Sequence, residues 1–180
     1  MFNREAAEAL LWSRVREVPD WPTPGVLFRD LSPLMADPVT FASAVDLMAV
    51  IIGHGTVDEV VGIEARGFPY GAALAYHLGA GFVTLRKPGK LPGDVHAKEY
   101  DLEYGSTSLE LHQDALGPGR RVVVVDDVLA TGGTACAAVE LVRMTGAHVV
   151  TFAVIMDLVA LGGGNRVRDL GVPVSALLSA

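Results

Sequence analysis

The sequence predicts an α/β fold in which a mostly parallel, twisted sheet is flanked by helices. Apolar stretches of strand length recur at residues 59–63, 122–125 and 148–155, and such stretches are typical of strands buried on both faces. The first two are each followed by a glycine-containing loop and then by small or apolar residues at helical spacing. Strands that alternate with helices favour a parallel sheet covered on both faces. We expect residues 1–180 to form one such domain.

The composition favours a folded, soluble protein. Hydrophobic residues make up 51% of the chain, which argues against disorder. The net charge of −7 argues against generic binding to nucleic acids or anionic membranes, although a local basic pocket stays compatible with it. No uncharged apolar segment approaches membrane-spanning length, and the N-terminus lacks the pattern of a signal peptide. We therefore expect a cytoplasmic protein without nucleic-acid or membrane partners.

Cysteine and histidine indicate neither a disulfide framework nor a zinc site. Cys136 is the only cysteine, and its position in an apolar helical pattern favours packing over a role as nucleophile. The five histidines are scattered without metal-ligand spacing.

Two helices and a proline-rich segment open the chain in this interpretation. Residues 4–15 favour a helix, and residues 20–25 favour an extended or turning segment. Asp37 and Pro38 predict the start of the second helix, because an acid suits the N-cap and proline suits the first turn. Gly53 predicts its end, and the buried face is formed by Phe41, Ala44, Val45, Met48, Ile51 and Ile52.

The strand at residues 59–63 begins a strand–loop–helix unit whose helix ends at Gly79. Arg66 lies in the loop, and two interpretations of it stay open: it binds an oxyanion through its planar guanidinium, or it pairs with Glu64 at the surface. A short strand at residues 82–85 then leads into residues 86–93, where three cations lie among prolines and glycines. This basic stretch is either a solvated loop or an electrostatic lid over a polyanionic substrate.

The second half of the chain continues the alternation. Two extended segments are predicted at residues 102–105 and 106–111, followed by a turn at residues 116–119. A helix after the central strand ends at Gly146. The remaining segments are a glycine-rich loop at residues 161–165 and a short closing strand at residues 173–178.

The central strand carries the chemistry. Its four valines end in Asp126 and Asp127, and residues 131–134 then lead into a helix. Ligands of open α/β sheets bind at the carboxyl ends of strands, and a glycine-containing loop at a helix N-terminus is an anion site. Carboxylates accept hydrogen bonds from vicinal hydroxyls and help to hold a hard divalent cation. Phosphate, diol and Mg²⁺ at one strand end together indicate a ribose phosphate.

A purely structural interpretation of this loop is that its Asp and Thr residues cap the helix. The acidic pair weighs against it, because two adjacent carboxylates at the end of a buried strand are costly without a ligand or partner. A Walker A loop is excluded, since no lysine follows Gly132 or Gly133.

Residues 123–134, VVVDDVLATGGT, resemble the phosphoribosyl-diphosphate (PRPP) binding motif of the type I phosphoribosyltransferases. Three further stretches resemble the adenine phosphoribosyltransferase branch of that family: PTPGVLFRD at residues 22–30, GIEARGF at residues 62–68, and LRKPGKLPG at residues 85–93 together with LEYG at residues 102–105. The similarity covers most of residues 19–157.

The resemblance implies the type I phosphoribosyltransferase fold, with a small hood of N- and C-terminal segments over the base site. It implies the reaction of adenine with PRPP to give AMP and diphosphate. The ribose hydroxyls and the 5′-phosphate would be bound by Asp126, Asp127, Ala130, Thr131, Gly132, Gly133 and Thr134. Diphosphate would be bound by Arg66, Arg86, Lys87 and Lys90, of which the last three belong to a closing loop.

The resemblance also implies a purine held between Phe28 and Val128, with main-chain groups near Leu27 and Arg29 at its edge. Without it, Phe28 is better interpreted as a core anchor. Glu103 would be the catalytic carboxylate beside adenine N7, and Tyr104 would lie on the closing loop. Mg²⁺ would be held mainly by PRPP with help from Asp127, and the protein would be a homodimer.

Two alternatives remain at this stage. An enzyme of the same reaction could use another base, such as hypoxanthine, guanine or xanthine. A non-catalytic PRPP-sensing regulator would keep the ribose-phosphate loop, but such proteins usually add a DNA-binding domain, and no basic segment of this kind is present.

Overall fold

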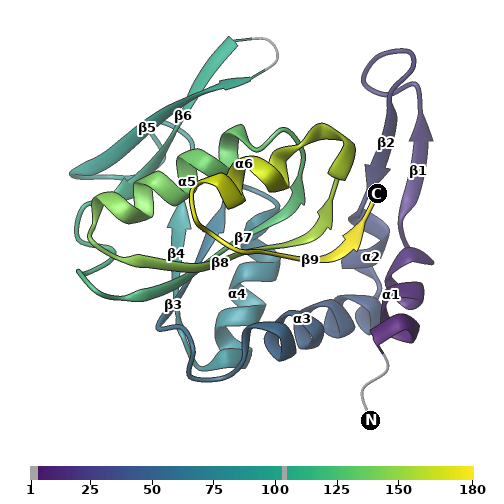
Figure 1. Cartoon of the computed structure of the whole chain (residues 1–180), viewed down its shortest axis with the longest axis horizontal. Helices are drawn as coiled ribbons and strands as arrows, with labels where there is room; N and C mark the ends of the chain where they lie inside the picture. The colour runs from purple at the N-terminus through teal and green to yellow at the C-terminus, as the bar shows by residue number, and fades with distance from the viewer. Residues whose placement is uncertain (1–3, 103–104) are drawn as a thin grey trace.

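The centre of the molecule is a five-stranded parallel sheet with the strand order β4-β3-β7-β8-β9 (Figure 1). The computed structural model describes residues 4–102 and 105–180. The strands are β3 (Glu59–Ile63), β4 (Gly81–Leu85), β7 (Arg121–Leu129), β8 (His148–Asp157) and β9 (Val174–Ser179). Every pairing within this sheet is parallel, which confirms the predicted α/β class.

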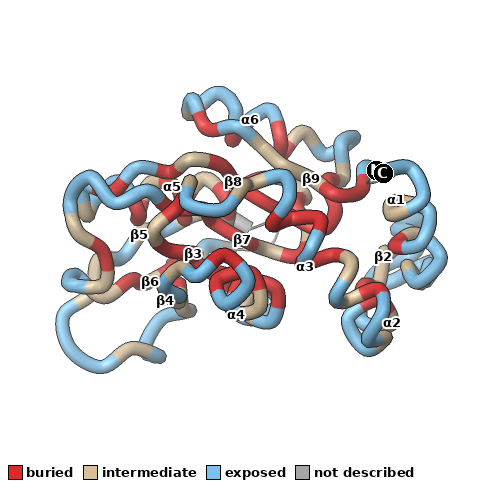
Figure 2. Tube along the Cα trace, turned by 90° about the horizontal axis from the view of Figure 1, so that it is seen from below, coloured by how far each residue is buried: buried red, intermediate tan, exposed pale blue. Residues whose placement is uncertain are grey.

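Helices cover both faces of the sheet. In Figure 1, α3 (Pro38–Ile52) and α4 (Gly67–Leu78) lie below it, and α5 (Gly133–Met144) and α6 (Gly163–Asp169) lie above it. The valines of β7 alternate between the two faces: Val122 and Val124 pack with α5, whereas Val123 and Val125 pack with α3 and α4. The central strands are therefore buried along most of their length (Figure 2).

The N-terminal segment forms a unit beside the C-terminal strand. Helix α1 (Arg4–Trp12) is shorter than the predicted helix and is followed by an antiparallel hairpin of β1 (Arg16–Pro19) and β2 (Leu27–Asp30). The predicted turn at residues 20–25 connects these strands. The short helix α2 (Ser32–Ala36) then leads to α3, whose predicted N-cap is confirmed, because Asp37 accepts hydrogen bonds from two amides of the first turn. No helix in the described part of the chain is both long and apolar enough to cross a membrane.

A second antiparallel hairpin, β5 (Val95–Leu102) with β6 (Gly105–His112), extends from the other end of the molecule (Figure 1). Strand β6 confirms the predicted extended segment at residues 106–111. Most of β5 was not predicted, because its sequence VHAKEYDL has no apolar run and the strand pairs only with β6. Glu103 and Tyr104, for which catalytic and loop-closing roles were predicted, lie outside the described residues.

Two predictions about loops were wrong. Strand β7 does not end at the valines but continues to Leu129, so Asp126 and Asp127 lie within the strand rather than following it, and Asp126 pairs with Val154 of β8. Residues 161–165 are not a loop: a 3-10 turn, η1 (Val159–Leu161), is followed directly by α6. The glycines at the start of α6 are required by packing, since a Cβ on Gly163 would lie 2.2 Å from the carbonyl oxygen of Ala130.

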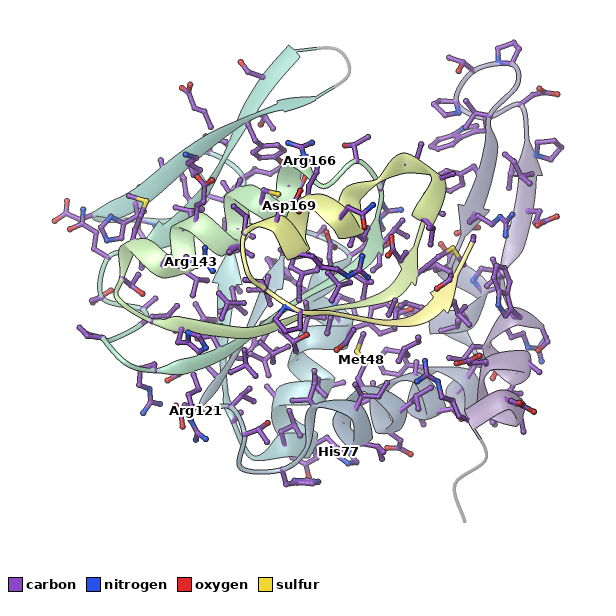
Figure 3. The ribbon with its side chains drawn as sticks, viewed as in Figure 1. Met48, His77, Arg121, Arg143, Arg166 and Asp169 are labelled. Atoms are coloured by element: carbon purple, nitrogen blue, oxygen red, sulfur yellow. The ribbon has the colours of Figure 1, made fainter. Side chains whose placement is uncertain are left out.

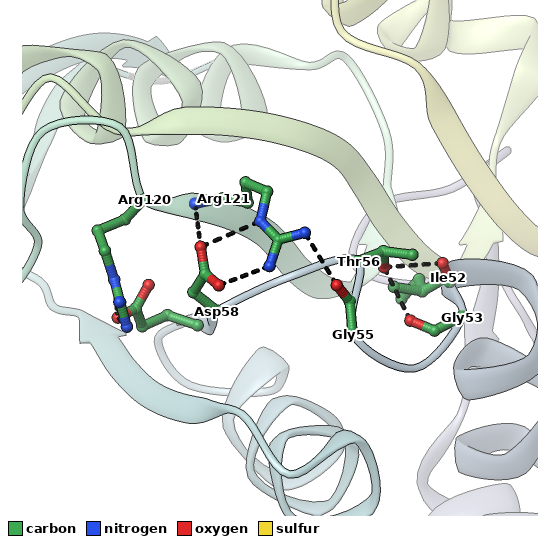
Figure 4. Close-up of polar contacts among 8 residues, drawn as sticks. Ile52, Gly53, Gly55, Thr56, Asp58, Arg120 and Arg121 are labelled. Atoms are coloured by element: carbon green, nitrogen blue, oxygen red, sulfur yellow. Dashed lines mark hydrogen bonds and ion pairs between the residues drawn. The ribbon is translucent and has the colours of Figure 1, made fainter.

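The amino ends of the strands are held by ion pairs (Figure 3; Figure 4). Arg121 donates from Nη2 to Asp58 Oδ1 at 2.7 Å, and its backbone amide donates to Oδ2 at 2.8 Å. These hydrogen bonds lower the pKa of Asp58 to about 2. Arg120 pairs with Glu59 beside them. The amino-terminal end of the sheet, opposite the predicted site, is thus stabilised by ion pairs at the starts of β3 and β7.

Gly67 allows α4 to approach β7 closely. A Cβ at this position would lie 2.5 Å from the carbonyl oxygen of Val125. We expect Gly67→Ala to lower the free energy of unfolding by about 1–3 kcal/mol, because backbone and helix must separate. Gly117→Ala is the matched control, since its Cβ would meet only Arg120 Cγ at 3.8 Å. Urea denaturation of both variants checks this, and equal effects would contradict it.

Candidate active site

A pocket of about 310 Å³ opens where the carboxyl ends of β3 and β7 meet. It is lined by the loop after β3, the end of β7, the loop into α5 and part of the β5–β6 hairpin. The structure therefore brings together, in one cavity, ten residues that the sequence predicts for the site: Arg66, Lys87, Asp126, Asp127, Val128, Ala130, Thr131, Gly132, Gly133 and Thr134.

The two acids of β7 share the floor of this pocket. Asp127 is only 4% exposed, and its backbone amide donates to Asp126 Oδ1 at 2.9 Å. Burial, together with the negative charge of Asp127, raises the pKa of Asp126 above its usual range. The pair is partly compensated by Arg66, whose Nε lies 3.0 Å from Asp127 Oδ2.

Arg66 and Glu64 do not pair with each other. Glu64 instead accepts hydrogen bonds from Arg86 Nε at 2.9 Å and from the backbone amide of Lys87 at 2.8 Å. These bonds, led by the one from Arg86, lower the pKa of Glu64. The alternative of a surface pair between Glu64 and Arg66 is thus wrong. The Arg66 side chain remains 61% exposed at the pocket, with a guanidinium that can reach an anion.

The loop before α5 has the geometry of an anion cradle. Gly132 is the N-cap of α5 in the left-handed conformation (φ 84°), which glycine adopts at little cost. No side chain caps this helix end. The interpretation in which Asp and Thr merely cap the helix is therefore wrong. The amides of the first turn are left for a ligand, and the helix dipole favours a negatively charged one.

The comparisons with known proteins agree with this geometry. The family model of the phosphoribosyl transferase domain matches residues 36–164. An adenine phosphoribosyltransferase from Acidothermus cellulolyticus is 54% identical over 157 residues, covering 87% of this chain and 89% of the relative. The chain belongs to the phosphoribosyltransferase family.

Solved structures of this family share the whole fold. Adenine phosphoribosyltransferase from Rhodothermus marinus has a TM-score of 0.90 and 43% identity, covering 98% of this chain and 99% of that one. The enzyme from Saccharomyces cerevisiae, solved with an imino-altritol bisphosphate and adenine, has a TM-score of 0.89 and 36% identity, covering 97% of this chain and 99% of that one. The predicted type I phosphoribosyltransferase fold is thereby confirmed.

Three of the residues predicted for the purine, Leu27, Phe28 and Arg29, lie on β2 and do not line the 310 Å³ pocket. The fourth, Val128, lies on β7 and does line it. Phe28 contacts Trp21 edge-on with ring centroids 4.3 Å apart, Arg29 lies over the Trp12 ring, and Leu27 is 47% exposed. A cavity of about 20 Å³ between Asp30, Ser32, Arg66 and Asp127 connects this segment to the acids. The purine sandwich stays a prediction for this phosphoribosyltransferase.

The predicted closing loop begins at the pocket. Arg86 is paired with Glu64 and lies over the Phe68 ring, with its guanidinium carbon 5.7 Å from the ring centroid. Lys87 lines the pocket, whereas Lys90 is exposed and acts on Glu64 only through its charge. Of these three predicted cations, Lys87 alone lines the pocket, and Arg86 is joined to it through Glu64.

Several residues of the pocket wall were not predicted from the sequence, and two of them lie on the β5–β6 hairpin. Tyr100 and Thr107 face each other in the register of the β5–β6 hairpin, and both line the pocket. No local motif marks them, because only the pairing of the hairpin brings them to the site.

Removing the charge of the half-buried Asp126 is expected to have opposite effects on ligand binding and on stability. Its raised pKa means that the folded chain holds the proton more tightly than the unfolded chain does. Ionisation of Asp126 therefore costs stability as the pH rises above the ordinary value of 3.8. We expect Asp126→Asn to unfold at a higher urea concentration than wild type at pH 7, with the gain lost below pH of about 4.

The same variant should bind PRPP about tenfold more weakly, because a hydrogen bond to a charged group is lost. Titration calorimetry with PRPP measures this, and Asp127→Asn is expected to weaken PRPP binding in the same direction. Asp114→Asn, an exposed acid on another loop, serves as the control. Unchanged PRPP affinity in both site variants would contradict the role of the acids.

Proposed function

We propose that this phosphoribosyltransferase transfers the phosphoribosyl group of PRPP to adenine, giving AMP and diphosphate. The observation that carries the proposal is the pocket in which an acid pair lies beside an uncapped helix N-terminus. The relatives named adenine phosphoribosyltransferase, at about half identity over nearly the whole chain, support the choice of adenine.

Each part of PRPP has a suitable partner in the pocket. The amides at the start of α5 would bind the 5′-phosphate, and Asp126 and Asp127 would accept hydrogen bonds from the ribose hydroxyls. Cleavage at the anomeric carbon develops positive charge on the ribose and negative charge on the departing diphosphate. Arg66 and Lys87 would stabilise that negative charge, and closure of the basic loop would exclude water.

The donor set fits Mg²⁺ bound jointly with substrate. Within residues 4–102 and 105–180, no group of three or more His, Cys, Asp or Glu side chains could hold a metal by itself. Mg²⁺ commonly uses one or two carboxylates plus substrate oxygens, and Asp127 offers such an oxygen in the pocket. We therefore propose that PRPP carries most of the ligands and that the ion supplies charge neutralisation at the diphosphate.

The purine would bind between Phe28 and Val128, with main-chain groups near Leu27 and Arg29 at its edge. Glu103 would meet the base as its proton distribution changes during attack by N9. A cytoplasmic location stays a prediction from the sequence, as does the organisation of residues 1–180 as one domain.

We also propose a homodimer, with the side of the molecule formed by α4 and β4 as its interface. Tyr76 on α4 is 92% exposed, Phe82 on β4 is also exposed, and β4 is an edge strand of the sheet. Light scattering after size exclusion should give twice the chain mass, and Tyr76→Glu should shift the protein toward monomer. Met144→Glu, at an exposed residue of α5 on the other face, is the control. A monomeric wild type would contradict the proposal.

The deciding experiment measures AMP formation from adenine and PRPP with Mg²⁺, in wild type and in Glu103→Ala. We expect turnover with adenine at least about a hundredfold above that with hypoxanthine or guanine, and a loss of about 10²–10⁴-fold in Glu103→Ala, the range for a general acid or base. Glu99→Ala, an exposed acid on β5, is expected to retain activity. Chelation by EDTA should abolish turnover.

Different failures point to different errors. Preference for a 6-oxopurine would reject adenine as substrate but keep the reaction class. Full activity of Glu103→Ala would reject only the assignment of that residue. PRPP binding without turnover on any purine would favour a PRPP-sensing regulator.

A further inference from the structure

The glycine-rich start of α6 packs backbone to backbone against the loop that precedes α5. The amide of Gly163 donates to the carbonyl oxygen of Ala130 at 3.0 Å. A Cβ on Gly132 would lie 2.9 Å from Gly163 Cα, so neither loop has room for a side chain at this contact. Helix α6 therefore forms the outer support of the proposed 5′-phosphate loop.

Arg166 makes a second connection between the same two segments. It lies in the last turn of the short helix α6 (Figure 3), and its Nη1 donates to the carbonyl oxygen of Thr131 at 2.9 Å. Arg166 also lines, together with Gly133 and Cys136, a hollow on the outer side of the α5 N-terminus. The guanidinium thus lies against both the loop and the first turn of α5.

This hydrogen bond fixes the orientation of one peptide group of the loop. The Thr131 carbonyl and the Gly132 amide belong to the same planar, trans peptide unit, so they point in opposite directions. Because Arg166 holds the Thr131 carbonyl, the Gly132 amide points away from the Arg166 guanidinium, and Gly132 itself lines the pocket.

The charge of Arg166 matters for the same site. Residues 126–134 contain two aspartates and no lysine or arginine, so a phosphate dianion in this loop meets no cation from the loop itself. Arg66 and Lys87 line the pocket from the loops that follow β3 and β4, and Arg66 is paired with Asp127. Arg166 brings a positive charge to the opposite side, behind the helix N-terminus.

We propose that Arg166 is a positioning residue of the 5′-phosphate site: it orients the Thr131–Gly132 peptide and supplies the countercharge behind the loop. The inference rests on the proposed function only in taking this loop as the site of a sugar 5′-phosphate. It does not depend on which base is used.

The test compares ligands with and without the phosphate. We expect Arg166→Gln to bind AMP and ribose 5-phosphate about tenfold more weakly than wild type, as for loss of a charge-assisted interaction, and to bind adenosine unchanged. The KM for PRPP should rise by a similar factor while kcat changes less than about twofold, because the phosphate is remote from the reacting carbon. Arg166→Lys, which keeps the charge but not the planar fork, should fall between wild type and Arg166→Gln.

Arg143→Gln is the matched control. Arg143 also donates a guanidinium hydrogen bond to a backbone carbonyl, that of Leu170 at 2.7 Å, but at the far end of α6. It should leave both ligand affinities unchanged. Thermal unfolding of all variants registers any general loss of stability.

Two results would overturn the proposal. One is wild-type affinity of Arg166→Gln for AMP and ribose 5-phosphate. The other is an equal loss for AMP and adenosine, which indicates a general structural role. If Arg166→Gln does not fold, Arg166→Lys decides by the same comparison of phosphorylated and unphosphorylated ligands. If wild type binds ribose 5-phosphate but does not use adenine, the assignment of adenine as substrate is wrong. The difference in ribose 5-phosphate affinity between wild type and Arg166→Gln still tests the role of Arg166.

Discussion

The arrangement of the site depends on two adjacent carboxylates within a buried strand. Asp126 and Asp127 lie in β7, where burial and the negative charge of Asp127 disfavour the ionised form of Asp126. As a result the pKa of Asp126 is raised, and the charge of Asp127 is compensated by Arg66, whose Nε lies 3.0 Å from its Oδ2. Arg66 can reach Asp127 only because Gly67, the next residue, lets α4 begin in direct contact with the backbone of β7. The close packing of α4 on β7 thus positions the cation that compensates the acid pair.

Much of the fold follows from local sequence patterns. The valines of β7, the EVVGI strand and the Asp37-Pro38 helix start each combine a strong propensity with a fitting neighbour, so their prediction did not depend on the rest of the chain. Strand β5 and helix α6 differ, because neither has a local pattern that would form it alone. The first is polar and depends on β6, and the second begins with glycines explained by tertiary contacts: Gly163 packs against Ala130 and Gly132, and Gly164 packs against Asp157.

The candidate site shows the same division. The acids and the phosphate loop were predictable because they are contiguous in sequence and lie in and after the carboxyl-terminal part of one strand. The partners of the charged groups were not, since spacing suggests that Glu64 meets Arg66, whereas the sheet brings Arg86 to Glu64 and Asp127 to Arg66. These ion pairs form because β3 pairs in parallel register with both β4 and β7, which places the ends of the three strands side by side. The contributions of Tyr100, Thr107 and Arg166 depend on tertiary contacts in the same way.

The distribution of charge around the pocket explains how a protein with a net charge of −7 is suited to a polyanionic substrate. Arg66 and Lys87 line the pocket on one side, Arg166 stands behind the phosphate loop on the other, and the acids lie between them. Such an order suits a ligand with anionic groups at both ends and hydroxyls in the middle, which is the charge pattern of PRPP. Salt largely screens charges that lie more than about 8–10 Å from a bound ligand, whereas the groups that line the pocket act on the ligand at shorter distances. In the proposed function, selectivity for PRPP would follow from the order of charges along the pocket, and the acids would help to fix its direction of binding by repelling a phosphate in the wrong position.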